Sequence, residues 1–152
     1  MANAVSASVK LMEGMSFEAT ATSGHTVVLD SAEEVGGRNQ GFRPMELILM
    51  GLGGCTGMDV ISILRKMQQQ VTGYEVRLSG DRASEHPKIY TDITVEHVVT
   101  GKGLVEASVR RAVELSATKY CPASAMLSKA ARVNHRYRMV DTDTGAETTG
   151  EL

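Results

Sequence analysis

The chain has 152 residues and a mass of 16.3 kDa, a length that suits one domain with a single sizeable core. Hydrophobic residues make up 42% and charged residues 22% of the sequence, which is ordinary globular usage and excludes a disordered chain. The 16 Lys and Arg against 18 Asp and Glu give a net charge of -2, so no basic excess points to nucleic acid or to an anionic membrane as a partner.

Targeting signals and a secreted disulfide scaffold are not indicated. Two cysteines are too few for a disulfide-dense secreted domain. Residues 1–6 have neither a cationic start nor an apolar run of signal-peptide length. The longest apolar stretch, residues 47–52, is far shorter than the about 20 residues that cross a bilayer. We therefore expect a cytoplasmic protein whose thiols are kept reduced and which has no membrane partner.

The first forty residues have the alternating pattern of β-strands. Apolar and polar side chains alternate over three short segments, with Gly-containing turns between them, at residues 5–11, 17–22 and 25–29. Two hairpins that form a three-stranded meander are the simplest interpretation. Residues 30–41 are polar and contain Gly36-Gly37, which predicts a loop.

A helix is predicted from Met45 to about Gln69, with Pro44 in its first turn. Its first half is apolar on every side, which is typical of a helix in the middle of a core. The same half contains four glycines, each costing about 1 kcal/mol relative to Ala in a helix, at positions 51, 53, 54 and 57. We therefore expect another backbone or a ligand to approach closely around Cys55. The second half is amphipathic, with Leu64 on its inward face.

The rest of the chain alternates strands and helices. Period-two patterns predict strands at residues 74–78 and 89–99 with a hairpin between them, and a last strand at 133–139. Helical patterns predict a helix over 104–119, with an apolar stripe at Val105, Val109, Ala112, Val113 and Ser116, and a short helix from Cys121-Pro122 through Ala131. This order argues for an α+β fold with helices on one face of an antiparallel sheet. We expect a single domain over residues 1–140 and a loose, polar C-terminal tail at 141–152.

The two cysteines are the sharpest chemical signal in the sequence. Cys121 is predicted to be an N-cap with Pro122 as the first helical residue, a place where free N–H groups and the helix dipole favour a thiolate. Cys55 lies inside a helix and needs a nearby cation to lower its pKa from about 8.5. The alternative, that both are small buried hydrophobic residues, stays open, because the 65 residues between them say nothing about their distance.

Other candidate residues have structural as well as functional interpretations. The four histidines are scattered without local metal-ligand spacing, so we expect no metal site and no cofactor. His97 and His135 fall on the inward phase of predicted strands and are expected to be core histidines. Glu46 either complements the helix dipole or orients an Arg beside a thiolate, and Asp59 is either a buried cap or contact or a catalytic group. The helix methionines are interpreted as adaptable core residues rather than a cofactor site.

Two segments resemble the OsmC/Ohr family (osmotically inducible protein C and organic hydroperoxide resistance). The first is Arg-Pro-Met-Glu-Leu-Ile-Leu-Met-Gly-Leu-Gly-Gly-Cys at residues 43–55, and its Pro-Met-Glu-Leu and Gly-Gly-Cys variants look most like the YhfA-like branch. The second is Lys-Tyr-Cys-Pro-Ala-Ser-Ala-Met-Leu at residues 119–127, where the family has a second cysteine. The resemblance covers roughly residues 5–140. It implies an OsmC-like two-layer fold, with antiparallel sheets packed on two long central helices in an intertwined homodimer.

The resemblance also implies an activity, that of a thiol-dependent peroxidase that reduces organic or inorganic hydroperoxides. By position, Cys55 corresponds to the peroxidatic cysteine and Cys121 to the resolving one. The Cys55 thiolate would attack the O–O bond, its sulfenic acid would condense with Cys121 to a disulfide, and an external thiol would reduce that disulfide. An apolar pocket lined by Met and Leu would suit an organic peroxide.

One departure concerns the activation of the thiolate. The family's peroxidases pair the thiolate with an Arg from the N-terminal β region, held by a Glu in the Pro-Glu segment. This chain has no Arg before Arg38, and Met45 occupies that Glu position, which leaves Glu46 as the neighbouring carboxylate. Arg38 and Arg43 are the candidates for the activating cation. Two other functions stay open on the same fold: a non-catalytic protein that binds a small apolar ligand, and a redox-responsive module whose Cys55–Cys121 disulfide changes a partner contact.

Overall fold

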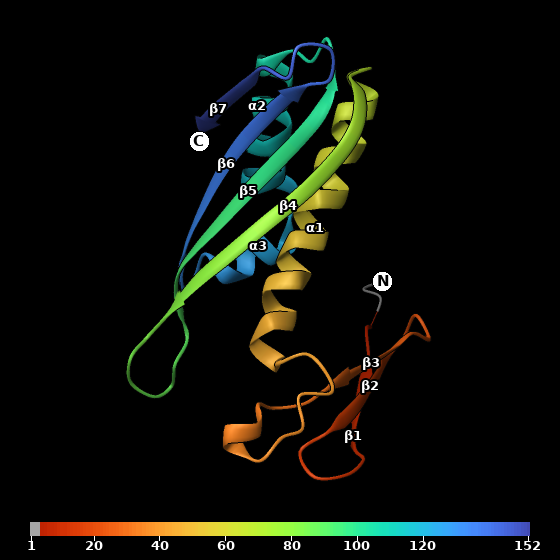
Figure 1. Ribbon diagram of the computed structural model, residues 1–152, viewed down its shortest axis with the longest axis vertical. Coiled ribbons are helices and arrows are strands. Elements are labelled where there is room, and N and C mark those ends of the chain that lie inside the picture. The colour runs from red at the N-terminus through yellow and green to blue at the C-terminus, as the bar shows by residue number, and fades with distance from the viewer. Residues whose placement is uncertain (1–3) are drawn as a thin grey trace. The chain divides into compact units, whose positions relative to one another are not determined.

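The computed structural model describes residues 4–152, and the chain divides into two compact units, Met1–Ile48 and Leu49–Leu152. Within residues 4–152, two sheets and three α-helices confirm the expected α+β class (Figure 1). Whether residues 1–140 act as the one predicted domain stays a prediction.

The N-terminal unit contains the predicted antiparallel meander. Its strands are β1 (Ala7–Leu11), β2 (Phe17–Ala21) and β3 (Thr26–Leu29), paired in that order. The polar loop that follows contains a 3-10 turn, η1 (Glu33–Val35). This loop is organised by the buried carboxylate of Asp30, which accepts backbone N–H bonds from Ser31, Arg38 and Gln40. Because this carboxylate binds three backbone N–H groups of the loop, it holds the loop in one conformation although the loop buries little apolar surface.

Helix α1 (Pro44–Lys66) begins at Pro44, the residue that was predicted to lie in its first turn. The Arg43 backbone N–H donates to Glu46 Oε2 at 2.9 Å, which satisfies one of the free donors at the helix start in the manner of a capping box. By length and composition alone α1 could cross a membrane, a test that core helices of soluble proteins also pass.

The C-terminal unit is built on a four-stranded sheet with the order β4-β5-β6-β7. Its elements are β4 (Gln70–Arg82), β5 (Tyr90–Lys102), α2 (Glu106–Leu115), the π-helical turn η2 (Ser116–Tyr120), α3 (Pro122–Leu127), β6 (Arg132–Asp141) and β7 (Glu147–Glu151). The predicted β4–β5 hairpin is antiparallel. The expectation of a wholly antiparallel sheet is wrong for one pair, because α2, η2 and α3 carry the chain back to start β6 parallel to β5.

The expectation of a loose C-terminal tail is also wrong. Residues 147–151 form β7, which pairs antiparallel with β6. The turn before it is closed by the Asp141 carboxylate, which accepts the N–H groups of Asp143 and Thr144, and by Gly145 at φ 72. β7 is an edge strand with mostly exposed side chains, so its sequence lacks the apolar alternation that identifies buried strands.

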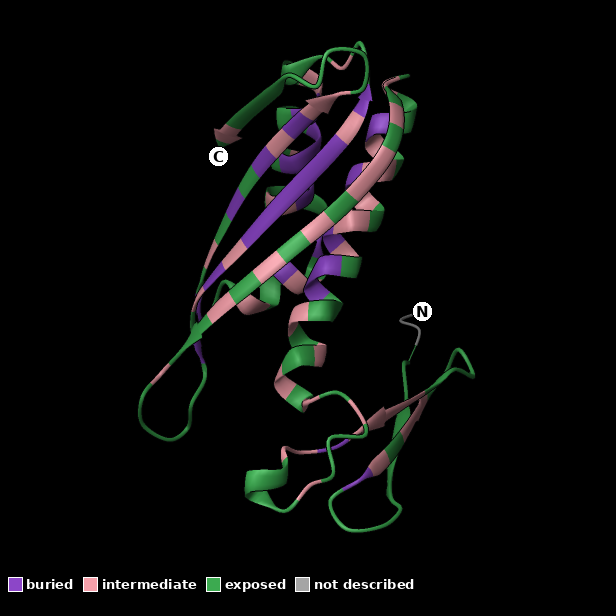
Figure 2. Ribbon diagram, in the orientation of Figure 1, coloured by how far each residue is buried: buried purple, intermediate pink, exposed green. Residues whose placement is uncertain are grey.

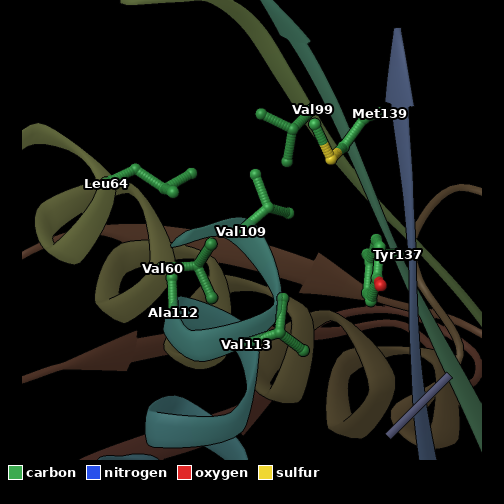
Figure 3. Packing of buried hydrophobic residues seen from close by; sticks show 8 residues of the cluster. All are labelled: Val60, Leu64, Val99, Val109, Ala112, Val113, Tyr137 and Met139. Atoms are coloured by element: carbon green, nitrogen blue, oxygen red, sulfur yellow. The ribbon is translucent and has the colours of Figure 1, made fainter. Parts of the chain in front are cut away.

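The core of this unit lies between the helices and one face of the sheet. Figure 3 shows how side chains from α1, α2, β5 and β6 meet there, with the cluster formed by Val60, Leu64, Val99, Val109, Ala112, Val113, Tyr137 and Met139. The predicted inward residues of α2 are buried except Val105, which is 51% exposed. Val105 has an extended backbone and precedes the helix, so the helical phase does not apply to it.

The glycines of α1 divide into two kinds. A Cβ at Gly53 would lie 2.6 Å from Leu78 Cδ1, and one at Gly57 would lie 3.4 Å from Val76 Cγ2. The close approach predicted around Cys55 is therefore made, at these two positions, by side chains of β4. A Cβ at Gly51 or Gly54 would have no neighbour within 4 Å among residues 4–152, so these two glycines lie on a face of α1 that its own unit leaves open.

Strand β5 departs from simple alternation because it is central in the sheet. It is buried almost continuously in its middle (Figure 2). On its helix-facing side the buried residues are those of the core. On its other side Glu96 is covered by two arginines from β6, with Arg138 at 3.3 Å and Arg136 at 3.6 Å from Glu96 Oε1. Glu96 is therefore only 7% exposed. Its burial is tolerated because the two arginines that cover it also pair with its charge.

Candidate functional site

Cys121 is the N-cap of α3, as predicted. Its backbone is extended, with φ -77 and ψ 106, and Pro122 opens the helix. The Ser124 backbone N–H donates to Cys121 Sγ at 3.3 Å. The π-helical turn before it is closed by a bond from the Cys121 N–H to the Ser116 carbonyl at 2.9 Å. Cys121 is 3% exposed, so a buried thiol is held by backbone geometry at a helix start.

Cys55 lies against Cys121. The Cys121 side chain and the Ala123 backbone N–H both lie close enough to the Cys55 sulfur to act on its pKa. Both cysteines are free thiols, with Cys55 half-buried. Burial raises the pKa of Cys55, the Ala123 N–H opposes this, and Cys121 and Asp59 raise the pKa further. Within this unit Cys55 is therefore a protonated thiol at pH 7.

A short chain of hydroxyl groups lies behind Cys55. The Ser116 hydroxyl donates to Asp59 Oδ2 at 3.0 Å, and Thr56 Oγ1 lies 2.7 Å from Ser116 Oγ. Because Ser116 gives its proton to Asp59, the Thr56 hydroxyl is the donor to Ser116. Thr56 and Ser116 are fully buried, so this arrangement satisfies polar groups that would otherwise destabilise the core. It also fixes Asp59 one turn after Cys55.

A second and longer row of polar side chains crosses the sheet on its helix-facing side. The Tyr74 hydroxyl lies 2.7 Å from His97 Nδ1, His97 Nε2 lies 3.2 Å from His135 Nδ1, and His135 Nε2 lies 3.4 Å from Ser124 Oγ. The rings of Tyr74 and His97 are stacked, as are those of His97 and His135. Three neighbouring strands and α3 thus contribute one residue each. We call these four residues the polar row.

The ionisable members of the polar row are neutral at pH 7. Burial lowers the pKa of His97 to about 3, with the neighbouring His135 adding to the effect, and lowers that of His135 to about 4. Burial and the nearby Asp59 carboxylate raise the pKa of Tyr74. The sequence-based expectation that both histidines are satisfied core residues is confirmed, since His97 is 0% and His135 7% exposed and both are hydrogen-bonded.

Two hollows adjoin the polar row. A cavity of about 490 Å³ is bordered by Ser124 and His135, together with Thr118 and Arg136. A groove of about 480 Å³ runs along α1 and β4, bordered by Tyr74 and by a largely apolar set, which includes Gly54, Gly57, Met58, Ile61 and Val76. The Tyr74 end of the row faces the groove and its Ser124 end faces the cavity.

The other predicted site residues lie in the N-terminal unit. Arg38 pairs with Glu13 at 3.0 Å, and the Arg43 guanidinium donates to Asn39 Oδ1 at 2.9 Å and to the Gly41 carbonyl at 3.1 Å. Glu46 accepts the Arg43 backbone N–H, which supports its structural interpretation as a helix-start carboxylate. Roles for these three residues in thiolate activation stay predictions. Over residues 4–152 no group of three or more His, Cys, Asp or Glu could hold a metal ion.

Sequence reasoning missed the hydroxyl groups around the thiols. Tyr74 lies on the inward phase of its strand, and Ser124 is the third residue after the N-cap Cys121. The burial of Tyr74 and the position of Ser124 beside Cys121 could therefore have been predicted from the sequence. Ser116 was predicted on the inward stripe of its helix and Thr56 carried no signal, but the hydrogen bond between them could not be predicted, because the partner of a buried hydroxyl is known only from the structure.

Comparison with known proteins agrees with this fold. The family model described as "OsmC-like protein" matches residues 37–136. Protein YhfA of Escherichia coli strain K12 is 42% identical over 137 residues, covering 88% of this chain and 97% of that protein. Among solved structures, an OsmC-like protein from Mycoplasma pneumoniae superposes with a TM-score of 0.79 at 16% identity, covering 92% of this chain and 99% of that one.

An organic hydroperoxide resistance protein OsmC from Legionella pneumophila superposes with a TM-score of 0.67 at 15% identity, covering 92% of this chain and 98% of that one. The two structural likenesses concern the fold, while the family model and the YhfA identity reach across the segments of both cysteines. The chain belongs to the family of OsmC-like proteins.

Proposed function

We propose that this protein is a thiol-dependent peroxidase that reduces hydroperoxides through Cys55 and Cys121. The observation that carries the proposal is the proximity of the two thiols, which is close enough for Cys121 to act on the pKa of Cys55, with the Ser124 N–H bonded to Cys121 Sγ. A structural role as two small buried residues would not require the thiols to meet. A disulfide between them requires it.

The chemistry follows from which thiol is more accessible. Cys55, half-buried, attacks the terminal oxygen of the hydroperoxide as a thiolate, which forms an S–O bond, breaks the O–O bond and releases an alcohol or water after protonation. Cys121, 3% exposed, then attacks the sulfenic sulfur, which forms the disulfide and releases water. An external thiol reduces the disulfide in two exchange steps.

Activation of Cys55 is the step that needs help from outside its own unit. Its raised pKa leaves little thiolate at pH 7, and a nearby cation is the usual remedy. Arg38 and Arg43 are the proposed activating residues, with Glu46 as the carboxylate that orients them. We further propose a homodimer, supported by the open glycine face of α1 and by Met58, which is 74% exposed on the same helix. A cytoplasmic location and a small external thiol complete the proposal.

The test is peroxide consumption by reduced protein. Wild type mixed with cumene hydroperoxide is expected to consume one peroxide for each pair of thiols lost. The Cys55→Ser variant is expected to lose this consumption almost entirely, because the attacking sulfur is absent. The Cys121→Ser variant is expected to consume one equivalent and to accumulate a sulfenic acid on Cys55, detected by mass spectrometry after reaction with dimedone. If Cys55→Ser consumes peroxide as fast as wild type, the proposal is wrong.

A binding function on the same fold is the second candidate, and the groove along α1 favours it. The groove of about 480 Å³ is lined mainly by apolar side chains, which suits a small apolar ligand. Wild type that consumes no peroxide while keeping both thiols reduced would favour this candidate. A redox-responsive module would instead form the disulfide stoichiometrically without turning over.

A further inference from the structure

The segment that carries Cys121 has little apolar attachment to the core. Over residues 116–127, which comprise η2, Cys121 and α3 and are all described by the structure, the buried residues are Ser116, Cys121 and Ser124. Burial of apolar side chains positions most segments of a folded chain, but here both buried neighbours of the cysteine are serines. The position of Cys121 therefore depends on the groups to which these two serines are bonded.

The first serine holds Cys121 against the helix that carries Cys55. The Ser116 carbonyl accepts the Cys121 N–H at 2.9 Å, which closes the π-helical turn. The Ser116 hydroxyl donates to Asp59 Oδ2 at 3.0 Å and lies 2.7 Å from Thr56 Oγ1. Thr56 follows Cys55 directly in α1, and Asp59 lies about one turn after it. Both partners of the hydroxyl are therefore close to Cys55 along the same helix.

The second serine holds Cys121 against the sheet. The Ser124 N–H donates to Cys121 Sγ at 3.3 Å, and Ser124 Oγ lies 3.4 Å from His135 Nε2. His135 belongs to β6 and is 7% exposed. Its Nδ1 lies 3.2 Å from His97 Nε2, and the two rings are stacked. Because the His135 ring is held at both nitrogens and on one face, it gives Ser124 a fixed attachment point.

Closure of a disulfide depends on this placement. The Cys121 sulfur must reach the Cys55 sulfur in line with the departing oxygen. Well-oriented intramolecular groups react as if at concentrations of about 10⁵–10⁸ M, and a misplacement of about 1 Å costs about 100-fold in rate. Ordering the segment before the reaction raises the effective concentration of the thiol, which favours both the rate and the equilibrium of closure.

We propose that Asp59 and His135 are positioning residues for Cys121. The inference rests on the proposed disulfide between the two cysteines. Asp59 acts through Ser116 and holds the start of the segment on α1, while His135 acts through Ser124 and holds its end on β6. In the step they assist, the S–S bond forms, the S–O bond of the sulfenic acid breaks, and the departing hydroxide takes the thiol proton and leaves as water. The two residues change how often the sulfur atoms are aligned and leave this balance unchanged.

The test follows closure from a mixed disulfide, which needs no peroxide. Reduced protein is mixed with dithiobis(nitrobenzoate), which places a thionitrobenzoate group on the more accessible Cys55. Attack by Cys121 on that sulfur then releases the group as a coloured thiolate. Stopped-flow absorbance gives the rate of this second release, and equilibration in glutathione buffers gives the reduction potential of the disulfide. Denaturant unfolding of each reduced variant establishes that it is folded under the assay conditions.

Ser124→Ala tests the attachment to the sheet, because it keeps the backbone N–H at the sulfur and removes only the hydroxyl. It is expected to slow the second release by at least about tenfold. The potential should become less negative by about 30 mV for each tenfold loss in the equilibrium constant of closure. Ser128→Ala is the matched control, since the Ser128 hydroxyl bonds to the Ala125 carbonyl at 3.2 Å, and it should match wild type. A folded Ser124→Ala variant with the wild-type rate and potential would overturn the role of His135.

Two substitutions at Asp59 separate its position from its charge. Asp59→Asn keeps an acceptor oxygen for the Ser116 hydroxyl and removes the charge, whereas Asp59→Ala removes both. Asp59→Asn should close at least as fast as wild type, and Asp59→Ala at least about tenfold more slowly than Asp59→Asn. Thr118→Ala, which removes a hydroxyl bonded to the Glu114 carbonyl at 2.7 Å, should match wild type. Equal rates in the two Asp59 variants would overturn the role of Asp59.

The same measurements distinguish this inference from the peroxidase activity. Closure that depends on Ser124 and Asp59 in a wild-type protein that consumes no peroxide would support the positioning roles and overturn the peroxidase. A wild-type protein that shows no second release would overturn the pairing of the two thiols, and the positioning roles with it.

Discussion

His97 and His135 are neutral inside the sheet because burial disfavours their charged forms, and each finds both a donor and an acceptor in the polar row. Burial also favours the neutral form of Cys55, because it raises the pKa of the thiol. At the scale of single residues, burial thus keeps these two histidines and Cys55 uncharged at pH 7, whereas the buried carboxylates of Asp30 and Glu96 are stabilised by backbone N–H groups and by arginines. A thiolate at Cys55 would be an exception to this pattern, and a cation brought close to the sulfur would be its physical cause.

The lowered histidine pKa values predict a loss of stability in mild acid. The unfolded histidines bind protons below about 6.5, while the folded ones resist protonation down to about 4 for His135 and about 3 for His97. The unfolded chain therefore binds more protons in this window, and the free energy of unfolding should fall as pH decreases from 6.5 toward 4. The expected slope is about 1.4 kcal/mol per pH unit for each histidine.

Denaturant unfolding at a series of pH values and one protein concentration measures this slope. His135→Gln should show a smaller slope than wild type, because one of the two buried titrating groups is gone. His25→Gln is the matched control, since His25 is exposed, and its slope should equal that of wild type. An unchanged slope in His135→Gln would contradict the assignment of a neutral, buried imidazole.

At the scale of elements, α1 packs closely on β4 at positions where the helix has no side chain. Gly53 lies under Leu78, and Gly57 lies beside Val76. The helix approaches the sheet closely there. Cys55 lies between these two glycines in the sequence, and it is adjacent to Cys121 and to Ala123 of α3. The cost of glycine in a helix, about 1 kcal/mol each, is offset by this close packing.

Gly53→Ala should therefore destabilise the protein although alanine is the better helix former. The added methyl would lie 2.6 Å from Leu78 Cδ1, and overpacking of this kind costs about 1–3 kcal/mol. In a Leu78→Ala background the same change should be neutral or stabilising by about 1 kcal/mol, because only helix propensity remains. Denaturant unfolding of the four proteins of this double-mutant cycle gives the coupling directly. Additive changes would mean that Gly53 and Leu78 do not pack as described.

At the scale of the whole molecule, α1 has more apolar surface than the other described residues of its own unit cover. Gly51 and Gly54 have no neighbour for an added Cβ, and Met50 and Met58 are 46% and 74% exposed. Exposed apolar surface on a long helix is typical of an interface with another chain. The proposed homodimer accounts for it, with two copies covering each other's helices.

Sedimentation equilibrium is expected to show a dimer at micromolar concentration. Met58→Glu should weaken it by at least about tenfold, because a charge would be buried without a partner. Val35→Glu, which changes another exposed apolar residue, 67% exposed in η1, should leave the dimer intact. A wild-type protein that sediments as a monomer, or a Met58→Glu variant that dimerises like wild type, would contradict the proposal.

Much of this structure could be predicted from the sequence because its signals are local. The meander, the proline at the start of α1, the β4–β5 hairpin and the N-cap Cys121 follow from alternation, helix-start chemistry and turn residues. The family resemblance added the fold. The edge strand β7 was missed because an exposed strand has no apolar alternation, and the parallel β5–β6 pair was missed because strand direction depends on the path of the chain between them.

By itself, the sequence determined that this chain is an α+β protein with two cysteines in distinctive settings and two inward-facing histidines. Only the tertiary structure decided that Cys55 meets Cys121, that Asp59 is held by Ser116, and that His97 and His135 join Tyr74 to Ser124. The physical reason is that helix capping and strand alternation are set by neighbours along the chain. Contacts among α1, η2, α3 and three strands depend on packing between residues as far apart in the sequence as Cys55 and Cys121, which have 65 residues between them.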